Sequence, residues 1–211
     1  MFTIVYTVHM ATSPAIRRSN QSEELRSIIL DAAREMFVEE GFEAFSMRKL
    51  AARVGYSPAS IYQHFASKDA LFQTLVQGSF QALVEVQAQA AANVDAPGPV
   101  AALKRGMHSY VRFGLDHPNE YRLAFLMPAS GKRSASAEAA FDSLRRRVEA
   151  CITAGLFRAI DAELAAQSLW VAVHGVTSLL IVKPSFPWVE KDRLIEQVIH
   201  NAVQGMVVPE I

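Results

Sequence analysis

The stretch from Phe45 to Leu71 constrains the fold most strongly, because it holds two short helical patterns joined by a glycine. Ser46 is a typical helix N-cap residue. After it, apolar residues recur at the i, i+3, i+4, i+7 spacing of a buried helical face: Met47, Leu50, Ala51 and Val54. Gly55 ends this helix, since glycine adopts positive φ without steric cost. Ser57 and Pro58 then supply an N-cap and a first-turn proline for a second helix.

The second helix is only about two turns long, which is too short to be stable alone. Ile61 and Phe65 are its expected inward residues. The other side chains point elsewhere: Ser57, Ala59, Ser60, Tyr62, Gln63 and His64. Two helices joined by a short turn with glycine, the second presenting small and polar residues, form the helix-turn-helix that enters a DNA major groove.

The charge of this stretch agrees with DNA binding. The segment from Ser46 to Lys68 carries the basic residues Arg48, Lys49, Arg53 and Lys68 and no acidic residue. The whole chain is neutral, with 21 basic and 21 acidic residues. Local basicity indicates phosphate binding, whereas overall neutrality argues against a protein that coats nucleic acid non-specifically.

The chain resembles the TetR family of bacterial transcriptional regulators at these residues. The matching motifs are G-F at 41–42, S-M-R-K-L-A at 46–51, V-G-Y-S-P-A-S-I-Y at 54–62, H-F at 64–65 and S-K-D-A-L at 67–71. The match spans residues 22–75. A further motif, W-x-x-x-H-G at Trp170, His174 and Gly175, resembles a signature of one C-terminal subgroup.

The resemblance implies an all-α fold. An N-terminal three-helix helix-turn-helix domain, residues 22–75, would be joined to a larger helical bundle, residues 76–211, for ligand binding and dimerisation. Residues 1–21 would form a flexible N-terminal arm. The other interpretations are that they form a solvated tail, or that the native chain starts at Met10. The resemblance also favours repression of a palindromic operator, relieved by a small hydrophobic effector.

The apolar periodicity supports these helices one by one. The first helix runs from Ser22 to Glu40 and is ended by Gly41. Its acidic face is predicted to point away from DNA: Glu35, Glu39, Glu40 and Glu43. A fourth helix, capped by Ser67, should continue from the DNA-binding head to about Ala92. Five more helical stretches are expected, with no strand pattern: 100–116, 117–127, 137–153, 161–182 and 190–207.

The last two of these stretches predict a homodimer. The segment from Leu169 to Val182 is apolar nearly all round, which is typical of a helix buried on all sides. The closing helix carries a strict apolar stripe from Leu194 to Met206. Together they offer more apolar surface than one subunit needs to cover. We therefore expect them to pair with their symmetry mates as a four-helix bundle, with Ala202 at the contact.

The sequence offers no catalytic chemistry. No two of its six histidines are spaced i, i+4, and no P-loop, G-x-S-x-G or G-x-G-x-x-G motif is present. The single cysteine, Cys151, is interpreted as a small buried hydrophobe. No apolar run reaches the roughly 18 residues of a membrane span. We expect a soluble, cytoplasmic protein that is not an enzyme, with no cofactor, no metal and no membrane partner.

Two sets of site residues follow. Four residues are predicted to hold DNA phosphates: Ser46, Tyr62, His64 and Lys68. Four others should approach base edges: Arg48, Ser57, Ala59 and Ser60. An effector pocket is expected among Met107, Tyr110, Phe125, Phe141, Trp170 and His174, although each of these could equally be ordinary core. The alternative functions are a helical-scaffold enzyme and an interaction module that has lost DNA binding.

Overall fold

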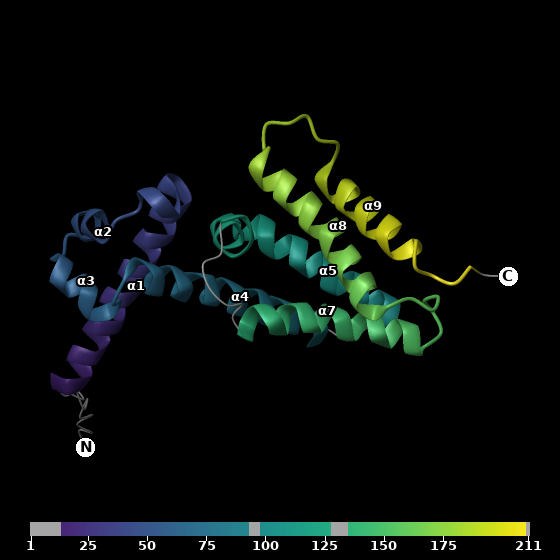
Figure 1. The fold of residues 1–211 in the computed structure, drawn as a ribbon, viewed down its shortest axis with the longest axis horizontal. Coiled ribbons are helices and arrows are strands. Elements are labelled where there is room, and N and C mark those ends of the chain that lie inside the picture. The colour runs from purple at the N-terminus through teal and green to yellow at the C-terminus, as the bar shows by residue number, and fades with distance from the viewer. Residues whose placement is uncertain (1–13, 93–97, 128–134, 210–211) are drawn as a thin grey trace, which may run out of the picture.

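Helices form all the regular elements among residues 14–92, 98–127 and 135–209, which are the residues that the computed structural model describes (Figure 1). They are α1 Pro14–Ala44, α2 Met47–Val54, α3 Pro58–His64, α4 Lys68–Ala92, α5 Gly98–Asp116, α6 Pro118–Tyr121, the π-helix η1 Arg122–Leu126, α7 Ala135–Thr153, α8 Ala162–Val182 and α9 Lys191–Gln204. The only β contact of this part of the chain is an isolated bridge between Phe157 and Val207. The all-α prediction is confirmed.

The first three helices form a small head with the expected caps and turn. The Ser46 Oγ accepts a hydrogen bond of 3.2 Å from the Lys49 amide at the start of α2. Gly55 ends α2 with φ of 75°, in the left-handed region that favours glycine. The Ser57 Oγ accepts from the Ser60 amide at 3.2 Å and caps α3. Each cap satisfies a backbone N–H that the helix itself cannot pair.

A compact aromatic core holds the head rigid. Phe37 of α1 stacks on Phe45 with ring centroids 3.9 Å apart. Phe72 of α4 contacts Phe37 edge to face, with centroids 5.1 Å apart. The two predicted inward residues of α3, Ile61 and Phe65, are both buried in this core. The short helix is thus stable because it packs, while its outer face stays free.

Helix α1 differs from the prediction at its beginning. It starts at Pro14 rather than Ser22, so residues 14–21 are helical. Residues 1–13, including Met10, lie outside the described residues. Near its end the helix is interrupted at Gly41, where φ is 81° and ψ is 168°. The glycine therefore breaks the first helix where the sequence predicted, and a short continuation to Ala44 leads into α2.

Helix α4 belongs to two hydrophobic cores. Its first turns contribute Leu71, Phe72 and Leu75 to the core of the head. Leu83, two to three turns further on, belongs to the core of the C-terminal bundle. Figure 1 shows α4 leaving the head and running under the remaining helices. The proposed domain boundary after residue 75 lies between these two groups, within one continuous helix.

The segment from α6 through η1 is a second link between the head and the bundle. Leu123 is buried in the core of the head, whereas Tyr121 and Phe125 pack in the core of the bundle. The Met127 amide donates to the Arg122 carbonyl at 3.0 Å, the five-residue spacing of a π-helix. Arg34 Nε on α1 lies 3.4 Å from Glu120 Oε1. Sequence periodicity predicted a short helix here but not its π geometry.

Helix α8 is not buried on all sides, contrary to the prediction. Its inner residues, such as Leu169 and Val173, pack in the core. A row on the opposite side is exposed: Leu164, Ser168, Val171, Leu179 and Val182. By length and composition alone α8 could cross a membrane. The search for an uninterrupted run of apolar residues did not identify it. It instead packs in the bundle beside α5, α7 and α9 (Figure 1).

Helix α9 also differs from the prediction, because its own subunit covers most of its apolar stripe. Four residues of the predicted stripe are buried in the bundle core: Ile195, Ile199 and Val203 of α9, and Met206 just after its end. Ala202 is half-buried and packs against that core. The exposed apolar surface of this helix pair therefore lies mainly on α8.

Candidate nucleic-acid interface and ligand cavity

The outer face of α3 carries small and polar side chains. Pro58, Ala59, Tyr62 and Gln63 are exposed, and half of the Tyr62 surface is accessible. Ser57 and Ser60 hydroxyls lie 2.9 Å apart, so both are partly engaged in capping the helix. These residues lie at the beginning and along one side of α3, as the sequence predicted. Their contact with DNA remains a prediction.

The basic residues of the head are less free than the sequence suggested. Lys49 Nζ lies 2.7 Å from Glu40 Oε2. Arg53 pairs with both Glu35 and Glu39 at 2.7 and 2.9 Å. Three residues of the acidic face of α1 therefore neutralise two basic side chains of α2. That this face points away from DNA stays a prediction. The hydrogen bond from Arg53 to Glu39 is also the main cause that raises the arginine pKa.

Lys68, one of the predicted phosphate ligands, has an internal partner. Its Nζ donates to the Phe42 carbonyl at 2.7 Å and lies 4.2 Å from the centroid of the Phe42 ring. The lysine thus fastens the start of α4 to the end of α1. Arg48 at the exposed surface of α2 has no ion pair among the described residues. It is the basic side chain of the stretch that remains free to meet a phosphate or a base.

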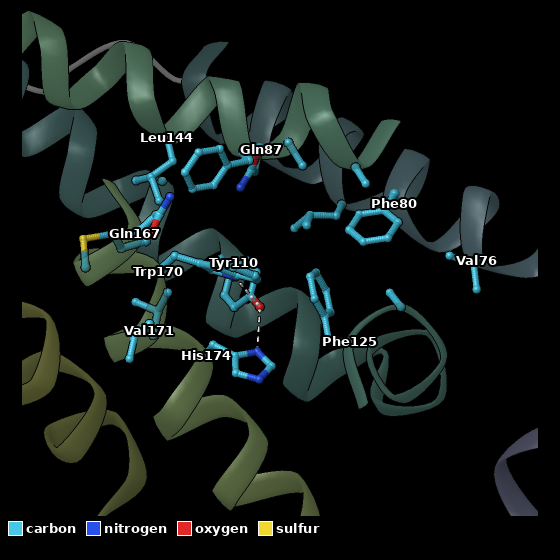
Figure 2. A pocket seen from close by; sticks show the side chains of 18 of the residues that line it. Val76, Phe80, Gln87, Tyr110, Phe125, Leu144, Gln167, Trp170, Val171 and His174 are labelled. Carbon is cyan, nitrogen blue, oxygen red and sulfur yellow. Dashed lines mark hydrogen bonds between the residues drawn. The ribbon is translucent and has the colours of Figure 1, made fainter. Parts of the chain in front are cut away.

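The C-terminal bundle encloses a cavity of about 460 Å³ (Figure 2). Side chains from α4, α5, η1, α7 and α8 line it. The six residues predicted for a ligand pocket all lie on its wall: Met107, Tyr110, Phe125, Phe141, Trp170 and His174. The structure brings them together from four separate elements. Ligand binding by these residues stays a prediction.

A chain of hydrogen bonds runs along one wall of the cavity. Trp170 Nε1 donates to the Tyr110 hydroxyl at 3.3 Å, and that hydroxyl donates to the Tyr121 hydroxyl at 3.2 Å. Tyr121 in turn lies 2.7 Å from His174 Nδ1. Burial lowers the pKa of His174 and so favours its neutral ring, which accepts this bond in the tautomer whose proton is on Nε2. The histidine is therefore both a satisfied core residue and part of the cavity wall.

Burial also favours the neutral forms of two tyrosines and the cysteine in the bundle. It raises the pKa of Tyr110 to about 12 and raises that of Tyr121 above its ordinary value. Both hydroxyls consequently remain protonated donors at neutral pH. Cys151 is completely buried, and burial raises the pKa of its thiol to about 11. This agrees with the interpretation of Cys151 as a small core residue, because a thiolate is the reactive form.

Sequence reasoning missed several cavity residues. The inner row of α4 contributes Val76, Phe80 and Gln87. Phe80 contacts Phe125 edge to face, with centroids 5.0 Å apart. Arg147 of α7 also lines the cavity. The helical spacing of this stretch marks Val76 and Phe80 as buried, but no local pattern indicates that they face a cavity rather than solid core, and none singles out Gln87 or Arg147.

Comparisons with known proteins match both parts of the chain. The profile "Bacterial regulatory proteins, tetR family" matches residues 29–75, and the profile "Tetracyclin repressor-like, C-terminal domain" matches residues 103–202. An uncharacterized HTH-type transcriptional regulator of Haemophilus influenzae is 29% identical over 63% of this chain and 63% of its own length. The HTH-type transcriptional regulator UidR of Escherichia coli is 41% identical over 26% of this chain and 29% of its own.

The chain thus spans less than two thirds of the length of these two curated relatives. Among solved structures, the TetR family transcriptional regulator PfmR of Thermus thermophilus superposes with a TM-score of 0.66. That likeness covers 86% of this chain and 99% of the other at 21% identity, and it concerns the fold. With its capped helix-turn-helix head matched by one family profile and its cavity-bearing bundle matched by the other, the chain belongs to the tetR family of bacterial regulatory proteins.

Proposed function

We propose that this protein is a dimeric, sequence-specific DNA-binding regulator of transcription that acts in the cytoplasm. It represses from a palindromic operator and is released by a small hydrophobic effector. The observation that carries the proposal is the geometry of α3. Ile61 and Phe65 anchor this helix in the head, while Pro58, Ala59 and Tyr62 face solvent with no intramolecular role for that face.

The head divides into phosphate contacts and base contacts. Ser46, Tyr62, His64 and the amides at the starts of α2 and α4 flank α3 and are suited to phosphates. Lys68 contributes indirectly, because it fixes the start of α4 against Phe42. Arg48, Ser57, Ala59 and Ser60 then approach base edges. Since small side chains offer few bidentate hydrogen bonds, much of the specificity would come from Arg48 and from DNA shape.

The exposed row of α8 supports the dimer. Leu164, Val171, Leu179 and Val182 each expose about half of their surface or more. Gly175 lies in the same row, and a Cβ added to it would meet nothing within 4 Å. A self-complementary helix face of this kind suits a two-fold four-helix contact with α9 at its edge. Two heads joined in this way can read two half-sites on one side of the duplex.

The cavity is coupled to the head through two elements. Phe72 and Val76 of α4 and Leu123 of η1 line the cavity, and Phe72 and Leu123 are also part of the core of the head. A ligand that fills the cavity must contact these side chains. If it binds better to one position of α4 and η1 than to another, it changes the spacing of the two heads and hence operator affinity.

A gel shift with the DNA that flanks the protein's own gene tests the regulator directly. We expect a retarded complex that survives an excess of unrelated duplex DNA. A turnover screen on the same preparation addresses the enzyme alternative. Binding that an equal concentration of unrelated DNA abolishes would refute sequence-specific regulation. The absence of any retarded complex would favour an interaction module that has lost DNA binding.

A further inference from the structure

Arg147 is a cation in the cavity wall with no anionic partner. It follows Ala140, Phe141 and Leu144 in the row of α7 that lines the cavity. Its guanidinium lies directly over Gly106 of α5, where a methyl group would overlap it. No ion pair or hydrogen bond joins it to any described residue, whereas Arg145 two positions earlier pairs with Asp142 and Glu149.

The surroundings of Arg147 make this lack of a partner costly. Burial lowers its pKa, and the neighbouring charges of Arg105 and Arg146 lower it further. The acidic residue on the cavity wall, Glu163, is exposed, and it accepts a hydrogen bond of 2.8 Å from Gln167. A partly buried guanidinium is stabilised by a bidentate anion, which it binds through two parallel N–H donors.

Gln87 supplies an independent observation at the same cavity. Its side chain is only 8% exposed, and its Oε1 is buried with no hydrogen-bond partner. It is the last residue of α4 in the cavity wall, one turn beyond Leu83. Buried amides in native structures are nearly always paired, so an unpaired one facing a cavity indicates a missing partner.

These polar groups lie away from the head along the helices that line the cavity. Gln87 is near the end of α4, Arg147 is in the second half of α7, and Gly106, under its guanidinium, is at the middle of α5. Figure 2 shows Val76 at one end of the cavity and Gln87 further along, on the side of Phe80 that faces away from Val76. The end near the head is apolar, with Phe72, Val76 and Leu123.

We infer that the cavity takes an organic anion with an elongated apolar body, its charged group on Arg147 and Gln87 and its tail directed at the junction of α4 and η1. This deepens the effector of the proposed function and rests on that function for its regulatory consequence. The charged group specifies the ligand class, and the tail reaches the residues that the cavity shares with the head. Gly106 is required because it leaves room for the guanidinium.

Direct binding of matched ten-carbon probes tests the charged group. The chain has two tryptophans, so the Trp188→Phe variant reports through Trp170 in the cavity wall. Decanoate and decyl phosphate are compared with decanol and decylamine, which have the same tail. We expect at least one of the anions to bind about tenfold or more tightly than decanol, and decylamine to bind more weakly than decanol.

Substitutions test which residues cause the preference for an anion over decanol. Arg147→Met keeps an apolar stem of similar length and should reduce the preference for the anion to about twofold or less, with decanol affinity unchanged. Gly106→Ala should have the same effect by displacing the guanidinium. Arg146→Met removes the same charge from the exposed neighbouring position and serves as the matched control, which should keep the preference.

Three results would overturn the inference. The first is decanol binding as tightly as both anions, and the second is an Arg147→Met protein that still prefers the anion. The third is failure of decyl phosphate and of all carboxylates from hexanoate to hexadecanoate to bind. Operator binding is measured separately on the same samples. An anion that binds as expected but never alters operator affinity supports the ligand class and contradicts the ligand response of the proposed function.

Discussion

Tyr62 on the exposed face of α3 places a hydroxyl beside the residues assigned to base edges. Removing it in Tyr62→Phe should weaken binding to operator and unrelated DNA alike, by about 1 kcal/mol for one phosphate hydrogen bond. Fluorescence anisotropy with both duplexes measures this. A changed operator preference with unaltered non-specific affinity would instead assign Tyr62 to base reading.

His174 gives the stability of the bundle a pH dependence. Burial lowers its pKa in the folded state, so the unfolded chain binds the proton more readily. Stability from neutral His174 is therefore present above the unfolded pKa of about 6.5 and is lost as pH falls from there toward the folded pKa. His174→Asn keeps an acceptor for Tyr121 but does not titrate. Its melting temperature should fall less than that of the wild type between about pH 7.5 and pH 5.5.

Equal losses of melting temperature in the two proteins would contradict this role of His174. The two tyrosines in contact with the histidine, Tyr110 and Tyr121, titrate far above this range and cannot produce the difference.

Individual residues were predictable where local patterns determine them. The caps Ser46 and Ser57 and the inward pair Ile61 and Phe65 follow from spacing within one helix. The partners of Arg53 could not be predicted, since Glu35 and Glu39 lie on another helix whose orientation the local pattern does not give. The unpaired state of Arg147 was unpredictable for the same reason.

At the scale of elements, Gly114 marks a close approach of α5 and α8. A Cβ at this position would overlap the side chains of Thr177 and Tyr121. Gly114→Ala should therefore destabilise the protein by about 1–3 kcal/mol through overpacking. Urea unfolding measures the change.

Gly78 of α4 is the matched control, because a Cβ there meets nothing within 4 Å. Gly78→Ala should stabilise the protein by about 0.5–1 kcal/mol, since alanine is the better helix former. Stabilisation by both substitutions would mean that α5 and α8 are not in close contact.

The order and number of helices followed from periodicity, whereas their ends and irregularities depended on tertiary contacts. The extension of α1 back to Pro14 was hidden because residues 14–21 carry no apolar stripe. The π geometry of η1 was hidden because Leu123 and Phe125 face two different cores. Apolar periodicity reports burial, but it does not say which core, cavity or second subunit covers a face.

For the whole molecule, the exposed row of α8 is a more specific candidate for the dimer interface than α9. Leu179 is half exposed in the single subunit, so Leu179→Glu should leave the fold intact. In a two-fold interface the carboxylate would be buried once per subunit, at a cost of several kcal/mol. Sedimentation should show a folded monomer with weakened operator binding.

Ala88→Glu adds the same charge to an exposed position of α4 and should remain a dimer. If folded Leu179→Glu sediments as a dimer and binds the operator normally, the subunits meet elsewhere. Ala202→Arg is a less specific test, because Ala202 packs against the core of its own subunit.

Selection of binding sites from a pool of random duplexes tests the central claim most directly, since it requires both sequence reading by α3 and two-fold pairing of the heads. The account predicts enrichment of an inverted repeat whose half-site centres are about 34–36 Å apart, or a multiple of that distance, along the duplex. Recovery of no preferred sequence, or of a single asymmetric site bound by one subunit, would contradict it.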